Sequence, residues 1–452
     1  MDLIYGIKDK PKFGQVVLFA IQQLLAIMAA TIAVPAAVNG SLVSMGLDPS
    51  GLNASAALFG AGCGSIVYLL FTKSKSPVFL GSSFAFIGSI VSAFSGALAL
   101  GLSAAAGYWG IILGALMAGL VYVIIAIVVK FCGVKWIDKL MPPVIIGPTV
   151  ATIGLSLAGN AIGDLTGASV TASTYVCIIC GLVTLAVTML CSVYGKKMLK
   201  MIPFIIGILA GYAVAAIFTV IGTKTGNESL VVINFGLFAN MTWVPDFSFI
   251  QAAKGFSAVD GSYIATVAVA YVPVAFVVFA EHIADHKNLS SIIGTDLLKE
   301  PGLHNTLLGD GVGSFVGAIF GGCPNTTYGE SIGCVAITGN ASVITIFVTA
   351  IICMVISFFN PFVVFLSSIP NCVMGGVCMA LYGFIAVSGL KMVQKVDLED
   401  NRNLFVVSVI LIAGIGGLAL TFGKIQITSI ATALILGIIA NLILGNKAKA
   451  AE

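Results

Sequence analysis

The sequence predicts an all-α polytopic membrane protein with about fourteen transmembrane segments, arranged as two halves of seven in an inverted repeat. Three observations support this fold class. First, 59% of the 452 residues are hydrophobic and only 9% are charged, whereas a soluble globular chain usually has about 25% charged residues. Second, the apolar residues form repeated runs of roughly 20, the length of a helix that crosses a bilayer. Third, the positively charged residues gather in alternate connecting segments, as the positive-inside rule requires.

Seven candidate membrane segments make up the first half of the chain, residues 1–221. Glycine, proline, asparagine or charged residues interrupt the apolar pattern between them. The first apolar run starts only after Lys12, so we expect no signal peptide and an insertion signal in the first segment itself. The segments are centred on residues 15–38, 54–72, 78–97, 104–129, 141–160, 174–194 and 201–221.

A more polar stretch, residues 222–260, is expected to be an extracytoplasmic linker between the two halves. Seven crossings leave the chain on the side opposite to its amino terminus, so a second set of seven runs in inverted topology. The second half, residues 261–452, has segments centred on 262–282, 304–321, 324–339, 342–359, 370–390, 404–420 and 427–445.

The distribution of charge tests this division of the chain into membrane segments. With the amino terminus in the cytoplasm, eighteen of the 21 lysine and arginine residues fall in inside segments, and only Lys224, Lys254 and Lys424 fall outside. The inverted orientation would violate the positive-inside rule and is rejected. We therefore expect a multi-pass protein of the cell inner membrane with both termini in the cytoplasm. The net charge of +3 gives no indication of nucleic-acid binding.

Two pairs of similar segments support the inverted repeat. Residues 141–147 (MPPVIIG) resemble residues 369–375 (IPNCVMG), and both open the fifth segment of their half. The third segment of each half also breaks its apolar pattern, at residues 81–86 (GSSFAF) and 325–330 (NTTYGE). Interrupted segments at matching positions indicate a binding site near the middle of the membrane in a transporter built from inverted repeats.

The helix-breaking, hydroxyl-rich stretch at residues 323–333 (CPNTTYGESIG) is the strongest candidate for that site. Non-helical backbone at membrane depth needs protein or a water-filled cavity to satisfy its polar groups. An ionisable residue there indicates a functional site, since its insertion costs about 3 kcal/mol. Glu330 lies in this stretch, and Glu281 ends the apolar run at residues 271–280. Asp310 is a weaker candidate near the start of its segment.

The chemistry of such a site suits a flat ring that alternates N–H and C=O groups, which describes a nucleobase. Where an extended stretch gives way to a half-helix, backbone N–H groups and the helix dipole converge on one point and suit carbonyl oxygens of a ligand. Carboxylates suit its N–H groups, and an aromatic side chain such as Phe84 or Tyr328 suits its flat face. Carboxylates in the membrane can also bind and release protons, as proton coupling needs.

The alternative to a transporter is an enzyme. His282 and His286 are spaced to bind zinc on one helix beside Glu281 and Asp285, which would suggest an intramembrane zinc enzyme. The order of these residues is not HExxH, because Glu281 precedes the first histidine. We therefore expect His286 and Lys287 to mark the cytoplasmic end of this segment, and we expect no enzyme, metal or cofactor. The Cys177–Cys180 pair lies inside an apolar run and is best explained by helix packing.

The motifs resemble those of the nucleobase–cation symporter 2 family (nucleobase–ascorbate transporters), and within it the bacterial uracil permeases. The resemblance spans nearly the whole chain. Its most specific part is residues 324–330 (PNTTYGE), which is similar to the pyrimidine-type form of the family signature, whereas purine transporters of the family usually have Gln-Asn there. Further matches are Gln22 and Leu24, residues 30–35 (ATIAVP), 80–87 (LGSSFAFI), 279–282 (FAEH), 296–298 (DLL) and 301–304 (PGLH).

This resemblance implies a fold with a core domain of segments 1–4 and 8–11 and a gate domain of segments 5–7 and 12–14. The extended stretches of segments 3 and 10 would pair across the core. Glu281 and Glu330 would accept hydrogen bonds from the base, while the backbone N–H groups of Phe84, Tyr328 and Gly329 would donate to its carbonyls. Dimerisation through the gate domain is a further expectation from the family.

The sequence departs from the family pattern at two positions near the presumed proton route, Gln23 and Asp285, and at Ser331, just beyond the Glu330 carboxylate. Gln23 stands where the permeases have His, Asp285 stands where a second His is expected, and Ser331 replaces the usual Asn. Proton-coupling candidates are therefore Glu281, Glu330 and Asp285. The resemblance implies a proton-coupled importer of uracil in contact with membrane lipid. The alternative is that a protein of the same fold imports xanthine or another nucleobase.

Overall fold

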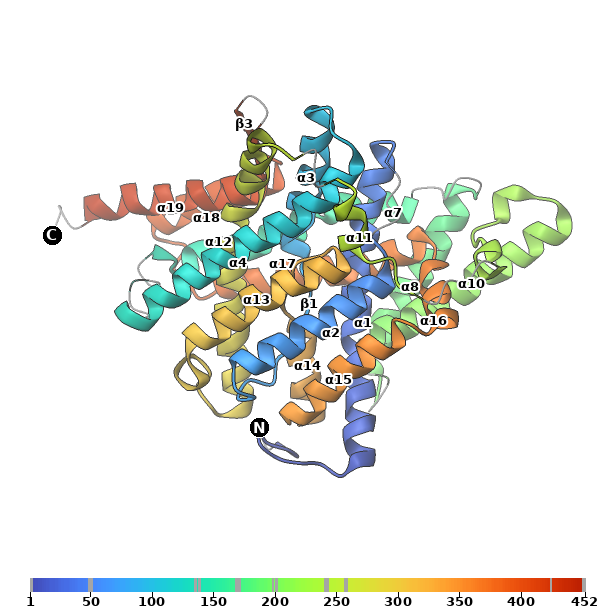
Figure 1. Ribbon diagram of the computed structural model, residues 1–452, viewed down its shortest axis with the longest axis horizontal. Helices are drawn as coiled ribbons and strands as arrows, with labels where there is room; N and C mark the ends of the chain where they lie inside the picture. The colour runs from blue at the N-terminus through green and yellow to red at the C-terminus, as the bar shows by residue number, and fades with distance from the viewer. Residues whose placement is uncertain are drawn as a thin grey trace.

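The computed structural model describes residues 3–47, 52–133, 136, 140–166, 172–196, 199, 202–239, 244–255, 259–422 and 425–448. Helices make up most of this part of the chain (Figure 1). Six lysines of the predicted charge distribution lie outside the described residues: Lys135, Lys139, Lys197, Lys200, Lys424 and Lys449.

Helices of the first half follow the predicted apolar runs closely, and the third run opens with an extended stretch. The bounds are α1 (Phe13–Ser44), α2 (Ala54–Phe71), β1 (Leu80–Ser82), η1 (Phe84–Phe86), α3 (Ile87–Ala99), α4 (Ala104–Cys132), α6 (Pro143–Ser156), α7 (Ala158–Thr166), α8 (Thr174–Tyr194) and α10 (Pro203–Thr225).

The stretch between the halves contains three short helices, η2 (Glu228–Leu230), η3 (Phe235–Ala239) and α11 (Ser248–Ala253). The second half repeats the pattern of the first, again with an extended stretch before the third helix. Its elements are α12 (Gly261–Ile293), η5 (Leu298–Gly302), α13 (Leu303–Gly321), β2 (Asn325–Thr327), α14 (Gly329–Thr338), α15 (Val343–Ile356), α16 (Asn360–Ser367), α17 (Asn371–Val393), α18 (Asn401–Ile415), β3 (Leu420–Phe422), β4 (Ile425–Ile427) and α19 (Ser429–Ala448).

Local sequence explains where the long helix α12 begins and ends. The Asp260 carboxylate caps its first turn by accepting a hydrogen bond of 2.8 Å from the Tyr263 N–H. Gly294 ends it in a left-handed conformation with φ of 68°, which glycine adopts without steric cost. The helix thus extends well past residue 282, where the predicted segment ended, and His286 lies within the helix, not at its end.

Eight helices within the described residues are long and apolar enough to cross a membrane: α1, α2, α4, the α6–α7 pair, α8, α10, α12 and α17. A ninth crossing is formed if α15 and α16, which meet at an angle of 84°, count as one bent span. The half-helices α3 and α14 are shorter, because extended residues occupy the start of each segment. The number of fourteen crossings remains a prediction.

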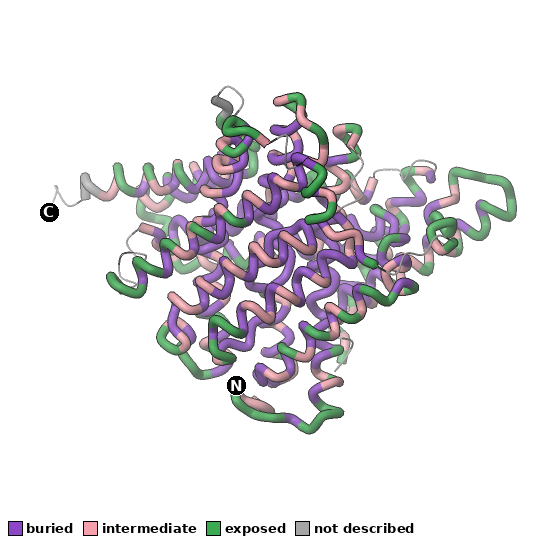
Figure 2. Tube along the Cα trace, viewed as in Figure 1, coloured by how far each residue is buried: buried purple, intermediate pink, exposed green. Residues whose placement is uncertain are grey.

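The helices pack in two groups. In one group, α13 packs against α2 and α4, α12 packs against α3 and α4, and α15 packs against α1 and α2. In the other, α17 packs against α6, α7 and α8, α10 packs against α8, and α18 packs against α6 and α19. Buried residues follow the central helices, while exposed residues dominate the outer end of α10 (Figure 2).

Close packing of α4 and α13 depends on a pair of glycines. A Cβ atom added to Gly119 would lie 2.8 Å from the carbonyl oxygen of Gly311, and one added to Gly311 would lie 3.0 Å from that of Gly119. The two backbones therefore approach as closely as they do in membrane helix pairs with small residues at the interface. This contact fixes α13, and with it Asp310, next to α4.

Two pairs of short strands complete the fold. Strands β1 and β2 are antiparallel, with Leu80 opposite Thr327 and Ser82 opposite Asn325. The predicted extended stretches of the third and tenth segments therefore meet in the interior, although they are more than 240 residues apart in sequence. Strands β3 and β4 form a second antiparallel pair between α18 and α19, which sequence analysis did not predict.

Candidate functional site

One cavity, of about 370 Å³, is lined by six of the residues that were predicted from the sequence. Cavities that bind small molecules usually have volumes of about 300–1,000 Å³, so this one suits a ligand of a single ring or two. The structure brings together residues from four separate elements here, η1, α12, the end of β2 and α14. They are Phe84, Glu281, Asp285, Tyr328, Gly329 and Glu330.

The strand pair holds two of these elements in place. The Ser65 side chain on α2 accepts a hydrogen bond of 2.8 Å from the Leu80 N–H and donates one of 3.1 Å to the Leu80 carbonyl. On the other strand, Asn325 donates from Nδ2 to the carbonyl of Gly60, over 2.9 Å. Both strands are therefore bonded to α2 as well as to each other, so their ends have fixed positions.

Tyr328, at the start of α14, connects the two strands a second time. Its hydroxyl donates a hydrogen bond of 2.8 Å to the carbonyl of Ser82, on β1. A Cβ atom added to Gly81 would collide with the Tyr328 ring, so glycine at this position allows the ring to cross the strand. The ring packs away from solvent, and this leaves the backbone of Tyr328 and Gly329 on the wall of the cavity.

The amino terminus of α14 opens on the cavity. The first N–H groups of a helix have no partner within the helix and carry the positive end of its dipole. The first intrahelical bond of α14 runs from the Ile332 N–H to the Tyr328 carbonyl, so the preceding N–H groups lie where Gly329 and Glu330 line the wall. No atom lies within 4 Å of a Cβ built on Gly329, so the space above this residue is open to a ligand.

Two further carboxylates lie on α12, one helical turn apart. Glu281 and Asp285 both line the cavity, and both are partly buried in the middle of the helix. The Thr327 hydroxyl donates a hydrogen bond of 2.7 Å to Asp285 Oδ2, which joins α12 to β2. Neither residue is at the end of its helix, since α12 continues to Ile293.

The remaining candidate acid, Asp310, lies outside this cavity in a fully buried network. Its Oδ2 lies 2.6 Å from His282 Nδ1, and His282 Nε2 lies 3.0 Å from the Thr306 hydroxyl. His282 and Asp310 are both inaccessible to solvent. Because His282 is adjacent to Glu281 on α12, this pair fixes the helix that presents the carboxylate.

His286 extends the network toward α2. Its Nδ1 lies 2.8 Å from the His282 carbonyl, and a carbonyl only accepts, so Nδ1–H is the donor. Its Nε2 lies 2.7 Å from the hydroxyl of Tyr68, which in turn lies 2.7 Å from that of Ser76. Both ring nitrogens of each histidine thus have protein partners. Within the described ranges, no group of three or more His, Cys, Asp or Glu is placed to hold a metal ion.

Two of the three departures from the family pattern touch each other. Gln23 Nε2 donates a hydrogen bond of 2.5 Å to the Ser331 hydroxyl. The same hydroxyl accepts from the Phe79 N–H, over 3.3 Å. Gln23 therefore links α1 to the residue after Glu330 and to the segment that leads into β1.

Sequence reasoning missed several polar residues of the cavity. Ser83, Thr326 and Thr327 lie within or beside the extended stretches, whose polar, hydroxyl-rich composition predicted a site there but not which hydroxyl groups line it. Ser192, Asn288 and Ser388 come from three helices that meet only in the folded protein. These three lie near Lys196, Lys287 and Lys391, so the cavity extends toward the lysine-rich end of the molecule.

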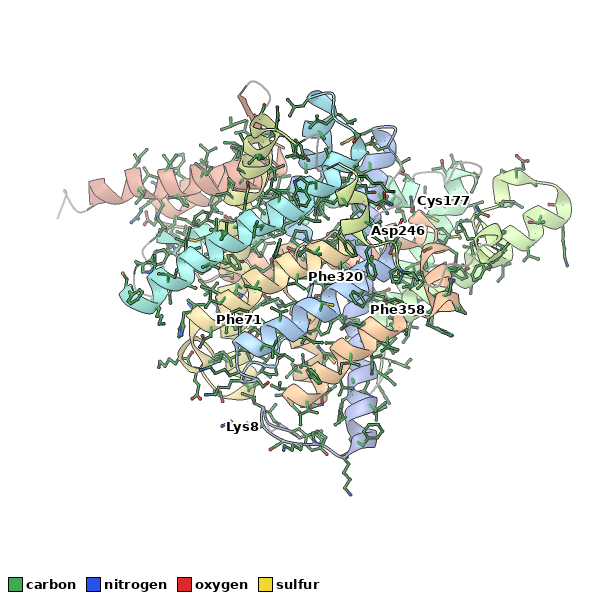
Figure 3. The ribbon with its side chains drawn as sticks, in the orientation of Figure 1. Lys8, Phe71, Cys177, Asp246, Phe320 and Phe358 are labelled. Carbon is green, nitrogen blue, oxygen red and sulfur yellow. The ribbon has the colours of Figure 1, made fainter. Side chains whose placement is uncertain are left out.

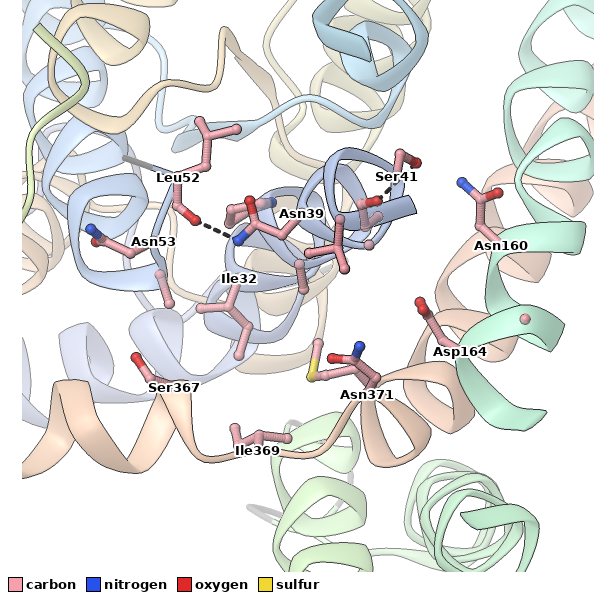
Figure 4. Close-up of a pocket in the computed structure, with 18 of the residues that line it drawn as sticks. Ile32, Asn39, Ser41, Leu52, Asn53, Asn160, Asp164, Ser367, Ile369 and Asn371 are labelled. Atoms are coloured by element: carbon pink, nitrogen blue, oxygen red, sulfur yellow. Dashed lines mark hydrogen bonds between the residues drawn. The ribbon is translucent and has the colours of Figure 1, made fainter. Parts of the chain in front are cut away.

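A larger cavity, of about 710 Å³, lies toward the opposite end of α1 and α17 (Figure 4). On α17, the first cavity reaches Ser388 and the larger one reaches Met374. The larger cavity is lined by polar side chains from α1, α7 and the start of α17, among them Asn39, Asn160, Asp164 and Asn371. Asn39 donates to the carbonyl of Leu52, over 2.6 Å.

Aromatic side chains lie between the two cavities. The ring of Phe84 meets that of Tyr382 edge to face, with 5.4 Å between ring centroids. Phe84 lies at the wall of the smaller cavity, whereas Tyr382 is buried in the middle of α17. The contact joins the two groups of packed helices at a position on α17 between Met374, which lines the larger cavity, and Phe384, which lines the smaller one.

Residues 14–422 match the family model described as "Permease family". The chain is similar to the uracil permease of Bacillus caldolyticus, at 38% identity over 99% of this chain and 96% of that protein. It is also 38% identical to the uracil permease of Bacillus subtilis (strain 168), over 97% of this chain and 94% of that protein. Among solved structures, it is similar to the transmembrane domain of a cyanobacterium bicarbonate transporter, BicA, with a TM-score of 0.61 at 15% identity, over 96% of this chain and 100% of that one. The last likeness concerns the fold alone.

Proposed function

Because the chain belongs to this permease family, we propose that it imports uracil across the cytoplasmic membrane as a proton-coupled secondary transporter. Two observations support this proposal. Two relatives that are each 38% identical to this chain over nearly its whole length are named uracil permeases. The cavity beside the strand pair also combines hydrogen-bond donors and acceptors that complement the edge of a uracil ring.

Binding would use both kinds of polar group on the wall. The two ring N–H groups of uracil donate to the carboxylates of Glu281 and Glu330. Its carbonyl oxygens accept from the backbone N–H groups of Phe84, Tyr328 and Gly329, which lie at the starts of η1 and α14. The placement of two carboxylates and two helix starts around one cavity is the single observation on which this binding mode rests.

Transport would follow from the two groups of helices moving against each other. We assign α1–α4 and α12–α15 to a core domain and α6–α10 and α17–α19 to a gate domain, in a seven-plus-seven inverted repeat with fourteen spans. The base site would face the cytoplasm in this structure, since its cavity extends toward the lysine-rich end. Opening the contact between Phe84 and Tyr382 would connect it to the larger cavity on the outer side.

Proton coupling would use the three carboxylates that line the cavity, Glu281, Asp285 and Glu330. Acidic residues inside a membrane protein often form proton pathways. The bond from Thr327 to Asp285 supports a link between protonation and the base site, because Thr327 belongs to the strand that leads into Tyr328. Both termini would lie in the cytoplasm, and two copies would pair through the gate domain.

The zinc-enzyme alternative lacks support from the histidines, because His282 and His286 are already bonded within the protein. The choice between uracil and xanthine is open to direct measurement. Isothermal titration of the purified full-length chain with each base tests the cargo. We expect saturable binding of uracil and at least tenfold weaker binding of xanthine. Preferential binding of xanthine would change the proposed substrate from uracil to xanthine but keep the proposed binding site. No binding of any base would overturn the proposed function.

A further inference from the structure

A third cavity, of about 460 Å³, lies at the lysine-rich end of the molecule, apart from the base site. Three segments that are distant in sequence enclose it: residues 7–10, the turn that follows α2, and the first residues of α15. Its rim is basic and its floor is apolar. The rim consists of Lys8, Lys10, Lys73 and Lys75, and the floor of Ile7, Val343, Ile344 and Phe347.

The amino-terminal segment is held in place by backbone hydrogen bonds to the stretch between α14 and α15. The Ala341 N–H donates to the Tyr5 carbonyl over 2.9 Å, and the Val343 N–H donates to the Ile7 carbonyl over 3.2 Å. Lys8 follows directly after Ile7. The backbone that bears these lysines is therefore fixed above the start of α15.

The opposite side of the cavity is a turn in an uncommon conformation. Lys73 and Ser74 have φ angles of 51° and 53°, in the left-handed region that side chains rarely adopt. The Ser74 N–H closes the turn by donating to the Leu69 carbonyl, over 2.9 Å. Such conformations persist where the surrounding structure imposes them, and they cluster at ligand clamps and switches.

Most of the positive charge on the rim has no protein partner. Lys75 pairs with Glu300, with 2.8 Å between Nζ and Oε1. The hydrogen bond and charge of Lys75, and after them the charge of Lys8, hold the pKa of Glu300 below its ordinary value, so Glu300 stays ionised and pairs with Lys75. The ion pairs among the described residues do not include Lys8, Lys10 or Lys73. Asp9, the other acid on this segment, accepts from the Gly6 N–H.

An exposed apolar surface continues from the floor of the cavity along α15. Phe347, Ile351 and Val355 follow one another at a spacing of four residues, and their exposed fractions are 43%, 39% and 66%. The neighbouring helix α2 adds Leu70 and Phe71 at its last turn, beside the turn that bears Lys73. Figure 3 shows Lys8 and Phe71 toward the same side of the molecule as the amino terminus.

We propose that this basic cavity binds the headgroup phosphate of an anionic phospholipid, whose acyl chain lies along Phe347, Ile351 and Val355. A phosphate on the rim would satisfy the lysines that lack a partner, and an acyl chain would cover the exposed stripe on α15. Lysines beside a membrane bind anionic lipid surfaces, each increasing affinity by about fivefold. A free phosphate ion would use only the rim and none of the apolar floor, so the shape of the site favours the lipid.

The test is native mass spectrometry of the purified full-length protein titrated with phosphatidylglycerol and, separately, with phosphatidylcholine of the same acyl chains. We expect one tightly bound phosphatidylglycerol and no comparable phosphatidylcholine. In the triple variant Lys8→Gln, Lys10→Gln, Lys73→Gln, affinity for phosphatidylglycerol should fall roughly a hundredfold. The matched control Lys196→Gln, Lys391→Gln, Lys395→Gln removes the same charge from other exposed positions at this end and should keep the bound lipid.

Two further experiments distinguish a lipid phosphate from a free phosphate ion and control for misfolding of the variants. Arginine at positions 8, 10 and 73 retains the charge and should retain the lipid, and each variant should keep the thermal midpoint of the parent protein. Inorganic phosphate at the lipid concentration should not displace phosphatidylglycerol. Equal loss of lipid in both glutamine triples, or displacement of the lipid by inorganic phosphate, would overturn the proposal.

Discussion

Gln23 on α1 donates a hydrogen bond of 2.5 Å from its side-chain amide to the hydroxyl of Ser331, the residue that follows Glu330 on α14. Both side chains are buried. Both stand where the family pattern has a different residue, His for Gln23 and Asn for Ser331. The two departures thus form one contact, and each side chain provides the partner that the other needs.

A double-mutant cycle tests this relationship. Gln23→Ala or Ser331→Ala alone removes one partner of a buried hydrogen bond and should lower the free energy of unfolding by about 1–3 kcal/mol. The double variant should lose less than the sum of the two, with a coupling energy of about 1 kcal/mol. Chemical denaturation in detergent measures all four proteins. Additive losses would show that the contact does not link the two sites.

Glu330→Gln should weaken uracil binding about 10- to 100-fold. The amide oxygen can still accept from a ring N–H group, but the charge of the carboxylate is lost, and a hydrogen bond to a charged group is worth about 1.5–3 kcal/mol. Titration calorimetry measures the affinity, and the thermal midpoint should remain within a few degrees of the parent. Glu228→Gln, an exposed position on η2, is the matched control and should bind normally. Unchanged affinity in Glu330→Gln would remove this residue from the binding site.

Gly329→Ala should fold normally and lose affinity for the base. The space around a Cβ at this position is empty, so the added methyl group meets no protein atom and enters the volume assigned to the ligand. Gly14→Ala, also in open space but at the exposed start of α1, should leave binding intact. A Gly329→Ala protein with full affinity would place the base elsewhere in the cavity.

Gly81→Ala is expected to act in a different way, through the fold. Its Cβ would collide with the Tyr328 ring, so either the ring or strand β1 must move. Overpacking of this kind costs about 1–3 kcal/mol. A thermal midpoint equal to that of the parent protein would contradict the arrangement of Tyr328 across β1.

Asp310→Ala should destabilise the protein by about 1–3 kcal/mol or more, since it leaves the buried His282 ring without its partner. Asp310→Asn keeps an oxygen and adds an N–H group, so it can bond to His282 Nδ1 in either tautomer and should cost less. Thermal unfolding of the two variants side by side measures the difference. Equal midpoints for both would show that the hydrogen bond to His282 does not stabilise α12.

Asp285→Asn separates binding from coupling. The amide oxygen can still accept from the Thr327 hydroxyl, so affinity for uracil should change by less than about threefold. An amide cannot cycle a proton, so accumulation against a uracil gradient should fail if Asp285 is the proton carrier. Equilibrium binding and uphill uptake measure the two properties separately. Normal uphill uptake would assign the proton to Glu281 or Glu330.

Much of this architecture follows from local pattern. The apolar runs locate the helices, and the polar interruptions at residues 81–86 and 325–330 locate the two strands and the helix starts beside them. Glu281 and Glu330 stand out because carboxylates are rare inside apolar segments. The register that sets Leu80 opposite Thr327 depends instead on bonds from Ser65 and Asn325 to distant backbone, which local pattern does not encode.

The burial of His286 is a feature that sequence pattern does not reveal. Polar residues such as Lys287 and Asn288 follow it and suggest the end of a membrane segment. In the folded protein, α12 continues to Ile293, and α2 supplies the Tyr68 hydroxyl as a partner for the ring. A histidine that is satisfied by another helix cannot be distinguished from a solvated one without knowing which helices are neighbours.

Uptake of radiolabelled uracil into proteoliposomes, with and without an inwardly directed proton gradient, tests the central claim most directly. The same assay with excess unlabelled xanthine tests the cargo. We expect accumulation that requires the gradient, persists with xanthine present and disappears in Glu330→Gln. Accumulation without any gradient, or undiminished uphill uptake in Glu330→Gln, would contradict a proton-coupled uracil importer that binds its substrate at this carboxylate.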